Sequence, residues 1–287
     1  MDEVLLVCHG HSVATARGSR NMWAMALIDI RGVQLEVVEV GPSATPVAHP
    51  DSTDIRPGPI VFLHEGLGSV AMWRDWPADV CSATGRTGWV YSRQGYGQSS
   101  PTTSKLPPDY LHHEAWDVLP ALLAHLGIQR PVLLGHSDGA SIALLYASRF
   151  PVTACIVLAP HVMVEDVSIQ SINQARDAFG DPKSGLRQRL ARYHTDVDGA
   201  FQQWNDAWLN PAFRAFDIRP DCRRISAPVL AVQGVDDPYG TMAQIDQIDL
   251  SAERIQRLPL AACGHSPHRD QTQLTTQAIT SFLASVD

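Results

Sequence analysis

The stretch "PVLLGHSDGASIALLYASRF", residues 131–150, decides the fold. Its first part is a short apolar run typical of a buried strand, and its last part has the small and apolar residues of a buried helix. Between them, Gly135-His136-Ser137-Asp138-Gly139 fits the pattern Gly-x-Ser-x-Gly. A serine in such a strand–turn–helix bend is strained, and glycines flank it because a Cβ atom would clash there. The setting predicts that Ser137 is a nucleophile, the alternative being a plain glycine-rich turn with a surface serine.

Strand and helix signals alternate around this stretch. Alternating apolar and polar residues on both sides of Arg31-Gly32 predict a β-hairpin over residues 26–41. Buried strands are predicted over 60–64, 88–93, 130–136, 153–160, 228–234 and 254–260, and helices over 110–127, 138–150 and 271–286. Repeated β-α-β units imply a mostly parallel sheet covered by helices on both faces. Ligands of such sheets bind beyond the carboxyl ends of the strands.

One interval interrupts the alternation. Residues 162–222 have helical patterns only, which predicts a helical lid inserted late in the sheet, over the strand ends. Residues 25–161 and 223–287 then form the two parts of one α/β core. A Pro-rich connection joins the hairpin to residue 60. Residues 1–24 precede the first periodic pattern as an amino-terminal extension of unknown role, with Met22 and Met25 as alternative start sites.

Composition narrows the class of protein. The chain has 287 residues, 45% apolar composition and a net charge of −8, with no Lys/Arg-rich run, which argues against nucleic acid or an anionic membrane as a partner. Five cysteines without a Cys-x-x-Cys pair argue against a disulfide framework or a zinc site. We expect a cytoplasmic protein that acts on a small molecule without a metal or organic cofactor, and the sequence leaves its oligomeric state open.

A nucleophilic serine needs a base and a carboxylate that orients the base, in the chain order Ser, acid, His on this kind of sheet. Asp237 follows the strand at 228–234 in "GVDDPYGT", three residues after Gly234, and is the predicted acid, with its neighbour Asp236 as the alternative. The predicted base is His265, in "ACGHSPHRD" between the last strand and the last helix, with His268 as the alternative.

The tripeptide Gly-His-Ser therefore occurs twice in the predicted site, once for its serine and once for its histidine. A third copy, residues 10–12, lacks a glycine two residues after its serine, because position 14 is Ala. We interpret that copy as a coincidence.

The segment "VFLHEGLGS", residues 61–69, resembles the His-Gly-x-Gly turn whose backbone N–H groups hold an oxyanion. The predicted donors are the amides of Leu67 and Asp138. With "SRQGYGQSS" at residues 92–100, the serine turn, the acid loop and the terminal histidine, the chain resembles the α/β-hydrolase superfamily from about residue 26 to its end. It departs from the usual pattern where His-Gly reads His64-Glu65-Gly66, and where Ser92 replaces an aspartate.

This resemblance implies a serine hydrolase that cleaves a small carboxylic ester through an acyl-enzyme intermediate. The alternatives are hydrolysis of a lactone or of a carbon–carbon bond in the breakdown of aromatic compounds, and a ligand-binding fold without turnover. Residues expected to contact substrate are Glu65, Tyr96, Trp204 and Trp208, although the tryptophans at helical spacing also suit packing of the lid against the core. His161 and Glu165 are weaker candidates.

Overall fold

A computed structural model describes residues 25–41, 58–102, 104–251 and 253–286. The predicted extension at residues 1–24, which holds the first Gly-His-Ser copy and Cys8, lies outside the described residues. Residues 42–57, most of the Pro-rich connection, also lie outside them.

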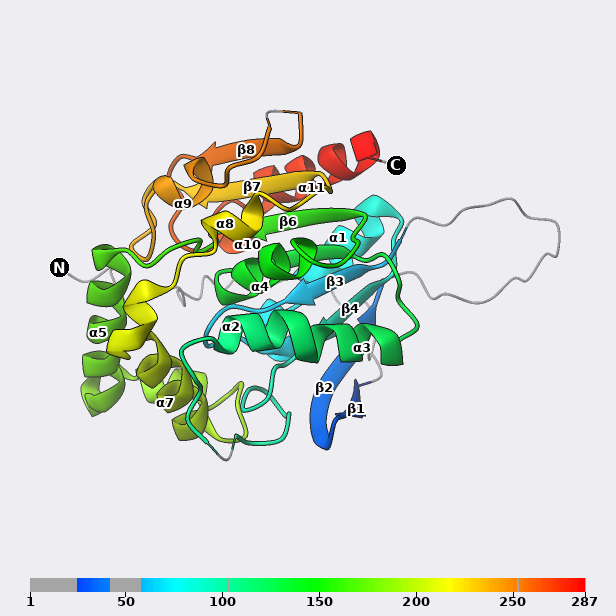
Figure 1. Cartoon of the computed structure of the whole chain (residues 1–287). Coiled ribbons are helices and arrows are strands. Elements are labelled where there is room, and N and C mark those ends of the chain that lie inside the picture. Colours follow the sequence, from blue (N-terminus) through cyan, green and yellow to red (C-terminus); the bar gives the residue numbers. More distant parts are fainter. Residues whose placement is uncertain (1–24, 42–57, 103, 252, 287) are drawn as a thin grey trace, which may run out of the picture.

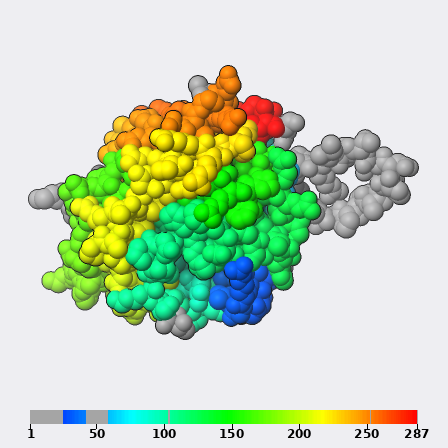
Figure 2. Space-filling view, in the orientation of Figure 1, coloured from blue at the N-terminus to red at the C-terminus, as the bar shows by residue number. Residues whose placement is uncertain are grey.

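The described residues form an eight-stranded sheet in the order β1-β2-β4-β3-β5-β6-β7-β8. The strands are β1 (Met25–Ile30), β2 (Val33–Val40), β3 (Ile60–Leu63), β4 (Gly88–Tyr91), β5 (Val132–His136), β6 (Ala154–Leu158), β7 (Val229–Gly234) and β8 (Ile255–Leu260). Only the pairs β1–β2 and β2–β4 are antiparallel among these strands. The mostly parallel sheet predicted from the sequence is confirmed, and Figure 2 shows the hairpin (blue) and β8 (orange) at opposite ends of the molecule.

The hairpin turns at Arg31 and Gly32, whose φ angles are 56° and 84°. Left-handed backbone at both central residues is what a tight two-residue turn requires, because it matches the twist of the flanking strands. The carboxylate of Asp29 accepts a hydrogen bond of 2.9 Å from the Gly32 amide. The predicted hairpin is therefore present, with its turn at the predicted dipeptide.

Strand order reverses at β3. The chain runs from β3 to β4 on one side and then crosses to β5 on the other side of β3. Leu63, the last residue of β3, is in register with Gly135 of β5. The segments that leave these two strands therefore start side by side, which opens a crevice at the carboxyl end of the sheet.

Helices cover both faces of the sheet (Figure 1). They are α1 (Trp76–Thr84), α2 (Tyr110–His113), α3 (Leu119–His125), α4 (Asp138–Ala147), α5 (Asp166–Gly180), α6 (Leu186–Leu190), α7 (Val197–Trp208), α8 (Arg219–Cys222), α9 (Ala243–Asp246), α10 (Pro267–Asp270) and α11 (Thr272–Val286). A π-helical segment, Glu114–Val118, joins α2 to α3, so the helix predicted over 110–127 is present with a change of winding. The helix α1 has no counterpart among the predicted elements.

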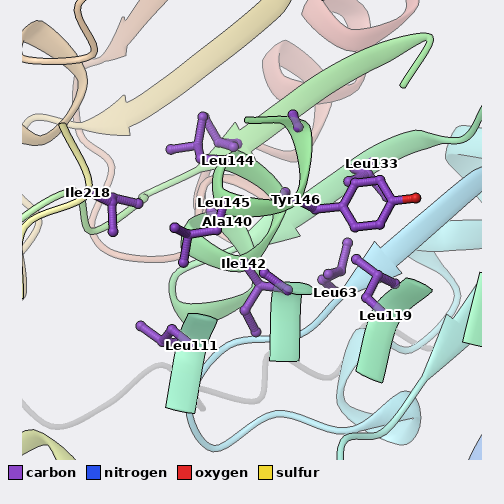
Figure 3. Packing of buried hydrophobic residues seen from close by; sticks show 14 of the residues in the cluster. Leu63, Leu111, Leu119, Leu133, Ala140, Ile142, Leu144, Leu145, Tyr146 and Ile218 are labelled. Carbon is purple, nitrogen blue, oxygen red and sulfur yellow. The ribbon is translucent and has the colours of Figure 1, made fainter. Parts of the chain in front are cut away.

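Alternate strand residues pack into two apolar clusters. Val61 and Leu63 belong to the cluster on the α4 side, whereas Ile60 and Phe62 belong to the cluster that includes residues of α1 and α11. Figure 3 shows Ile142 of α4 among leucines of the sheet and of the neighbouring helices. Since both faces are buried, the central strands read in the sequence as continuous apolar runs.

The interval between β6 and β7 contains α5, α6, α7 and α8, together with 3₁₀ turns at Pro182–Ser184 and Pro211–Ala215. We call residues 162–222 the helical segment. Figure 1 shows α5 and α7 beside each other at one end of the sheet. None of the described helices combines the length and the apolar character needed to cross a membrane.

Candidate active site

Ser137 stands in the bend between β5 and α4 with φ = 53° and ψ = −118°. A non-glycine residue in this region is strained by about 1–3 kcal/mol. The bend leaves no room at Gly139, where a Cβ atom would overlap the main-chain carbonyl of Leu63, or at Gly135, where it would overlap Gly139 itself. The amide of Ser137 donates a 2.9 Å hydrogen bond to the carbonyl of Leu158 in β6. The sheet and the two glycines thus hold a single strained serine at the strand end.

A chain of hydrogen bonds joins Ser137 to His265 and Asp237. Nε2 of His265 is 2.9 Å from Oγ of Ser137, and Nδ1 is 2.8 Å from Oδ2 and 3.0 Å from Oδ1 of Asp237. An ionised carboxylate only accepts, so Nδ1 carries the ring proton. Nε2 is then free to accept the proton of the serine hydroxyl.

The Asp237 carboxylate has two further donors. Oδ2 accepts from Nε2 of Gln233 at 2.8 Å, and Oδ1 accepts from the amide of Tyr239 at 2.8 Å. Burial raises the pKa of Asp237, but the charge and hydrogen bond of His265, together with the hydrogen bond from the Tyr239 amide, hold it below its usual value. Burial likewise lowers the pKa of His265, but Asp237, followed by the charges of Glu65 and Asp138, outweighs burial and raises it. Asp237 therefore stabilises the protonated form of His265.

The alternative residues for these positions lie elsewhere. Asp236 is exposed to solvent. The ring of His268 is buried against Trp73 and Trp76, with centroid distances of 5.0 and 5.2 Å. The structure therefore places Asp237 rather than Asp236, and His265 rather than His268, in the hydrogen-bonded chain with Ser137.

The turn after β3, residues 64–68, is held by Arg93. The Arg93 guanidinium donates to the carbonyls of His64 and Glu65 at 2.7 and 3.1 Å. The Arg93 amide donates to Nε2 of His64 at 3.0 Å, so the His64 proton is on Nδ1, which donates to the Glu65 carbonyl at 2.6 Å. These bonds fix the peptide planes of the turn that faces α4.

The predicted oxyanion donors, the amides of Leu67 and Asp138, both belong to residues that line a cavity with Ser137. Asp138 is the first residue of α4, where an amide has no acceptor within its helix. Among the described residues, no backbone carbonyl accepts a hydrogen bond from the amide of Leu67, which lies in a turn. The Leu67 carbonyl is fixed by Nε2 of His194 at 3.0 Å.

The cavity has a volume of about 130 Å³. An apolar cavity of roughly 150 Å³ holds a benzene molecule, so this one suits a group of a few carbon atoms. Segments from both parts of the core and from α5 and α7 line it: Glu65, Gly66, Leu67, Ser137, Asp138, His161, Ile172, Trp204, Trp208, Tyr239 and His265.

Three of the four expected substrate contacts line this cavity. Trp204 lies so close to Gly66 that a Cβ atom there would overlap its indole ring, and Nε1 of Trp208 donates to Oδ1 of Asp138 at 3.1 Å. Glu65 is the third. The fourth, Tyr96, is not brought to the cavity, because it is buried against His64 with a centroid distance of 5.2 Å. Its expected substrate contact is therefore corrected to a packing contact.

Sequence reasoning missed two lining residues. Tyr239 follows the acid by two positions, and its ring centroid is 4.8 Å from that of His265, so the acid loop itself was the available signal. Ile172 of α5 carried no signal in the sequence. Of the weaker candidates, His161 lines the cavity, whereas the carboxylate of Glu165 is bound by Thr241 and Gln244.

The replacement of an aspartate by Ser92 is matched by a carboxylate from another strand. Oγ of Ser92 donates to Oε2 of Glu36 in β2 at 2.7 Å and accepts from the amide of Val70 at 2.9 Å. Glu36 also accepts from the amide of Gln98 at 3.0 Å. The carboxylate that organises the turn after β4 is therefore present, but it comes from β2.

Comparison with known proteins agrees with this architecture. A family model described as the alpha/beta hydrolase fold matches residues 58–174. The chain has the α/β-hydrolase fold. A carboxylesterase structure from the thaumarchaeon Nitrososphaera gargenis shares the fold of this α/β-hydrolase with a TM-score of 0.70 and 18% identity, covering 92% of this chain and 98% of that one.

Two curated relatives are similar to this chain in sequence. It is 28% identical over 158 residues to the human serine hydrolase BPHL, covering 52% of this chain and 53% of that protein. It is 25% identical over 215 residues to the bifunctional esterase/perhydrolase DCH of Acinetobacter calcoaceticus, covering 63% of this chain and 75% of that protein. The match thus spans only about half the length of the human relative.

Proposed function

We propose that this α/β-hydrolase is a serine esterase that cleaves small carboxylic esters through an acyl-enzyme. The observation that carries the proposal is the hydrogen-bonded chain from Ser137 through His265 to Asp237, which opens on the cavity. A serine becomes a nucleophile when an adjacent base takes its proton and a third group orients that base. The carboxylesterase fold likeness and the esterase among the curated relatives support the same class.

In the first half of the reaction, Oγ of Ser137 attacks the carbonyl carbon of the ester while Nε2 of His265 takes the hydroxyl proton. The tetrahedral intermediate then collapses, the bond to the alcohol oxygen breaks, and His265 returns the proton to the departing alcohol. In the second half, His265 takes a proton from water, the hydroxide adds to the acyl carbon, and the acid is released as Ser137 regains its proton. The steps as written use no metal ion or cofactor.

The negative oxygen of each intermediate needs hydrogen-bond donors. The amides of Leu67 and Asp138 are our proposed donors, because both residues border the cavity next to Ser137. One donor of this kind typically contributes on the order of 3 kcal/mol to transition-state stabilisation.

The cavity limits the substrate. Its volume of about 130 Å³ and its aromatic lining favour a short apolar acyl group such as acetyl or butyryl. The proposed lid role of the helical segment follows from the same observation, since Ile172, Trp204 and Trp208 close the cavity from α5 and α7.

The test is a panel of p-nitrophenyl esters of increasing acyl length, run beside a lactone and a vinylogous diketo acid. We expect turnover of acetate and butyrate, a sharp fall by octanoate, and no turnover in Ser137→Ala, whose fold is checked by circular dichroism. Full activity of folded Ser137→Ala would remove the serine from the mechanism. Turnover confined to the lactone or to the diketo acid would replace the esterase proposal with that reaction.

A further inference from the structure

A second histidine–carboxylate contact lies beside the first. Nδ1 of His136, the residue before Ser137, is 3.4 Å from Oε2 of Glu65 in the turn after β3. The side chain of His136 is 2% exposed and that of Glu65 is 17% exposed. A Cβ atom at Gly68 would overlap this carboxylate and the Cβ atom of His64, so the carboxylate lies against the main chain of the turn.

The other nitrogen of His136 settles where the ring proton lies. Nε2 is 2.6 Å from the main-chain carbonyl oxygen of His265. A carbonyl oxygen can only accept, so Nε2 carries a proton and donates it. If Nδ1 bore a lone pair, that lone pair would face the Glu65 carboxylate. The arrangement is attractive when a proton lies between Nδ1 and Oε2, and with Glu65 ionised that proton is on Nδ1, which makes His136 an imidazolium.

The surroundings favour an ionised Glu65. Burial raises the pKa of Glu65, but the contact with His136 and the charge of Arg269 act in the opposite direction, and that pKa lies well below its usual value. The titratable rings packed against His136 are His265, at a centroid distance of 5.1 Å, and His268, at 4.9 Å. Trp73 covers a further side, at 6.3 Å.

An unpaired carboxylate at this place would oppose the proposed reaction. Glu65 belongs to the turn that supplies the proposed oxyanion donor Leu67, and both residues line the cavity with Ser137. A negative charge there repels the oxyanion of the tetrahedral intermediate. A positive charge on His136 would cancel it, and Nε2–H of the same ring donates to the main-chain carbonyl of His265, the proposed base.

We propose that Glu65 and His136 form an ion pair in which His136 is a positioning residue: it neutralises the carboxylate at the oxyanion turn and fixes the main chain of His265 through Nε2–H. The contacts at 3.4 Å and 2.6 Å carry this assignment. Its kinetic consequence rests on the proposed esterase function, whereas the charge of His136 does not.

The kinetic test is reversal of a defect by a second substitution. His136→Phe keeps a ring of similar size but leaves Glu65 unpaired, and we expect kcat for p-nitrophenyl acetate to fall about 100-fold, with KM changed less than about threefold. Glu65→Gln alone should lower kcat several-fold, because it leaves the imidazolium without its partner. Added to His136→Phe, however, Glu65→Gln should raise kcat at least about tenfold, because it removes the unpaired charge.

His268→Phe is the matched control, because it replaces a buried imidazole that packs against the same Trp73. It should keep kcat within about threefold of the wild type. A double variant no faster than His136→Phe would overturn the charge-cancelling role, as would a loss in His268→Phe equal to that in His136→Phe.

The charge itself is measured without turnover. In ¹⁵N NMR spectra at pH 7, assigned with His136→Phe, both ring nitrogens of His136 should carry protons in the wild type and in Ser137→Ala. Glu65→Gln should shift the ring to the neutral Nε2–H form. A neutral His136 in an active enzyme would refute the ion pair, whereas an imidazolium in a protein without esterase activity would refute the proposed function and leave the pair standing.

Discussion

Replacing Asp237 by asparagine tests the proposed acid with almost no change of size. The carboxylate accepts from Nδ1 of His265, from Gln233 through Oδ2 and from the amide of Tyr239 through Oδ1. Asparagine has a single acceptor oxygen, so its NH₂ group must oppose one of the donors or face His265. Facing the ring, it stabilises the tautomer with the proton on Nε2, which then cannot take the proton of Ser137.

The expected loss follows from that tautomer. In serine proteases the wrong histidine tautomer lowers kcat about 10⁴-fold, and each factor of ten corresponds to about 1.36 kcal/mol, so the cost is about 5.5 kcal/mol. Since the Asp237 carboxylate is also almost fully buried, at 1% side-chain exposure, solvent cannot substitute for it. We expect kcat/KM of Asp237→Asn for p-nitrophenyl acetate to fall by roughly 10³ to 10⁴.

Asp236→Asn is the matched control. It removes the same charge from the neighbouring position, but Asp236 is exposed, so kcat/KM should stay within about threefold of the wild type. Thermal unfolding of both variants checks that each is folded at the assay temperature. If Asp237→Asn kept more than about a tenth of the activity, or if Asp236→Asn lost as much, our assignment of the acid would be wrong.

Two further predictions concern pH and the helical segment. Burial, with the charge of His265, lowers the pKa of His161 to about 3, and burial also lowers those of His64 and His268. All three are neutral in both states above about pH 6.5, so stability is full there, and it falls by up to about 1.4 kcal/mol per pH unit for each as the unfolded chain takes up protons below that pH. A melting temperature that does not drop between pH 7 and pH 5 would contradict this reasoning. Trp204→Ala should enlarge the cavity and shift the preferred acyl chain to longer lengths, and an unchanged chain-length profile would show that Trp204 does not limit the substrate.

The sequence alone predicted the sheet because its central strands are buried on both faces. Runs such as residues 153–160 and 228–234 have a single environment along their length, so the apolar pattern is continuous and the strands appear within two residues of the predicted positions. That Ser137, Asp237 and His265 lie close together was also predictable, because each follows a strand of one parallel sheet and the carboxyl ends of such strands meet at one edge.

What the sequence did not show are contacts between segments far apart in the chain. The helix α1 is short and begins Trp76-Pro77, and it is held by packing with α11 and the sheet more than by its own periodicity. Tyr96 lies between two glycines in a stretch that suits a binding loop, yet its ring packs inward against His64 and Arg93. Similarly, the Trp208 indole that bonds Asp138 is 70 residues away along the chain. No local pattern encodes such pairs.

The bond between Ser92 and Glu36 ties the turn after β4 to a strand of the amino-terminal hairpin. The two positions therefore share one carboxylate, and their identities are not independent. Restoring the usual aspartate at position 92 would place two carboxylates together where both side chains are buried, unless Glu36 changed in the same step. In related chains we would expect these positions to exchange as a pair, with the acid on β2 and a hydroxyl after β4, or the reverse.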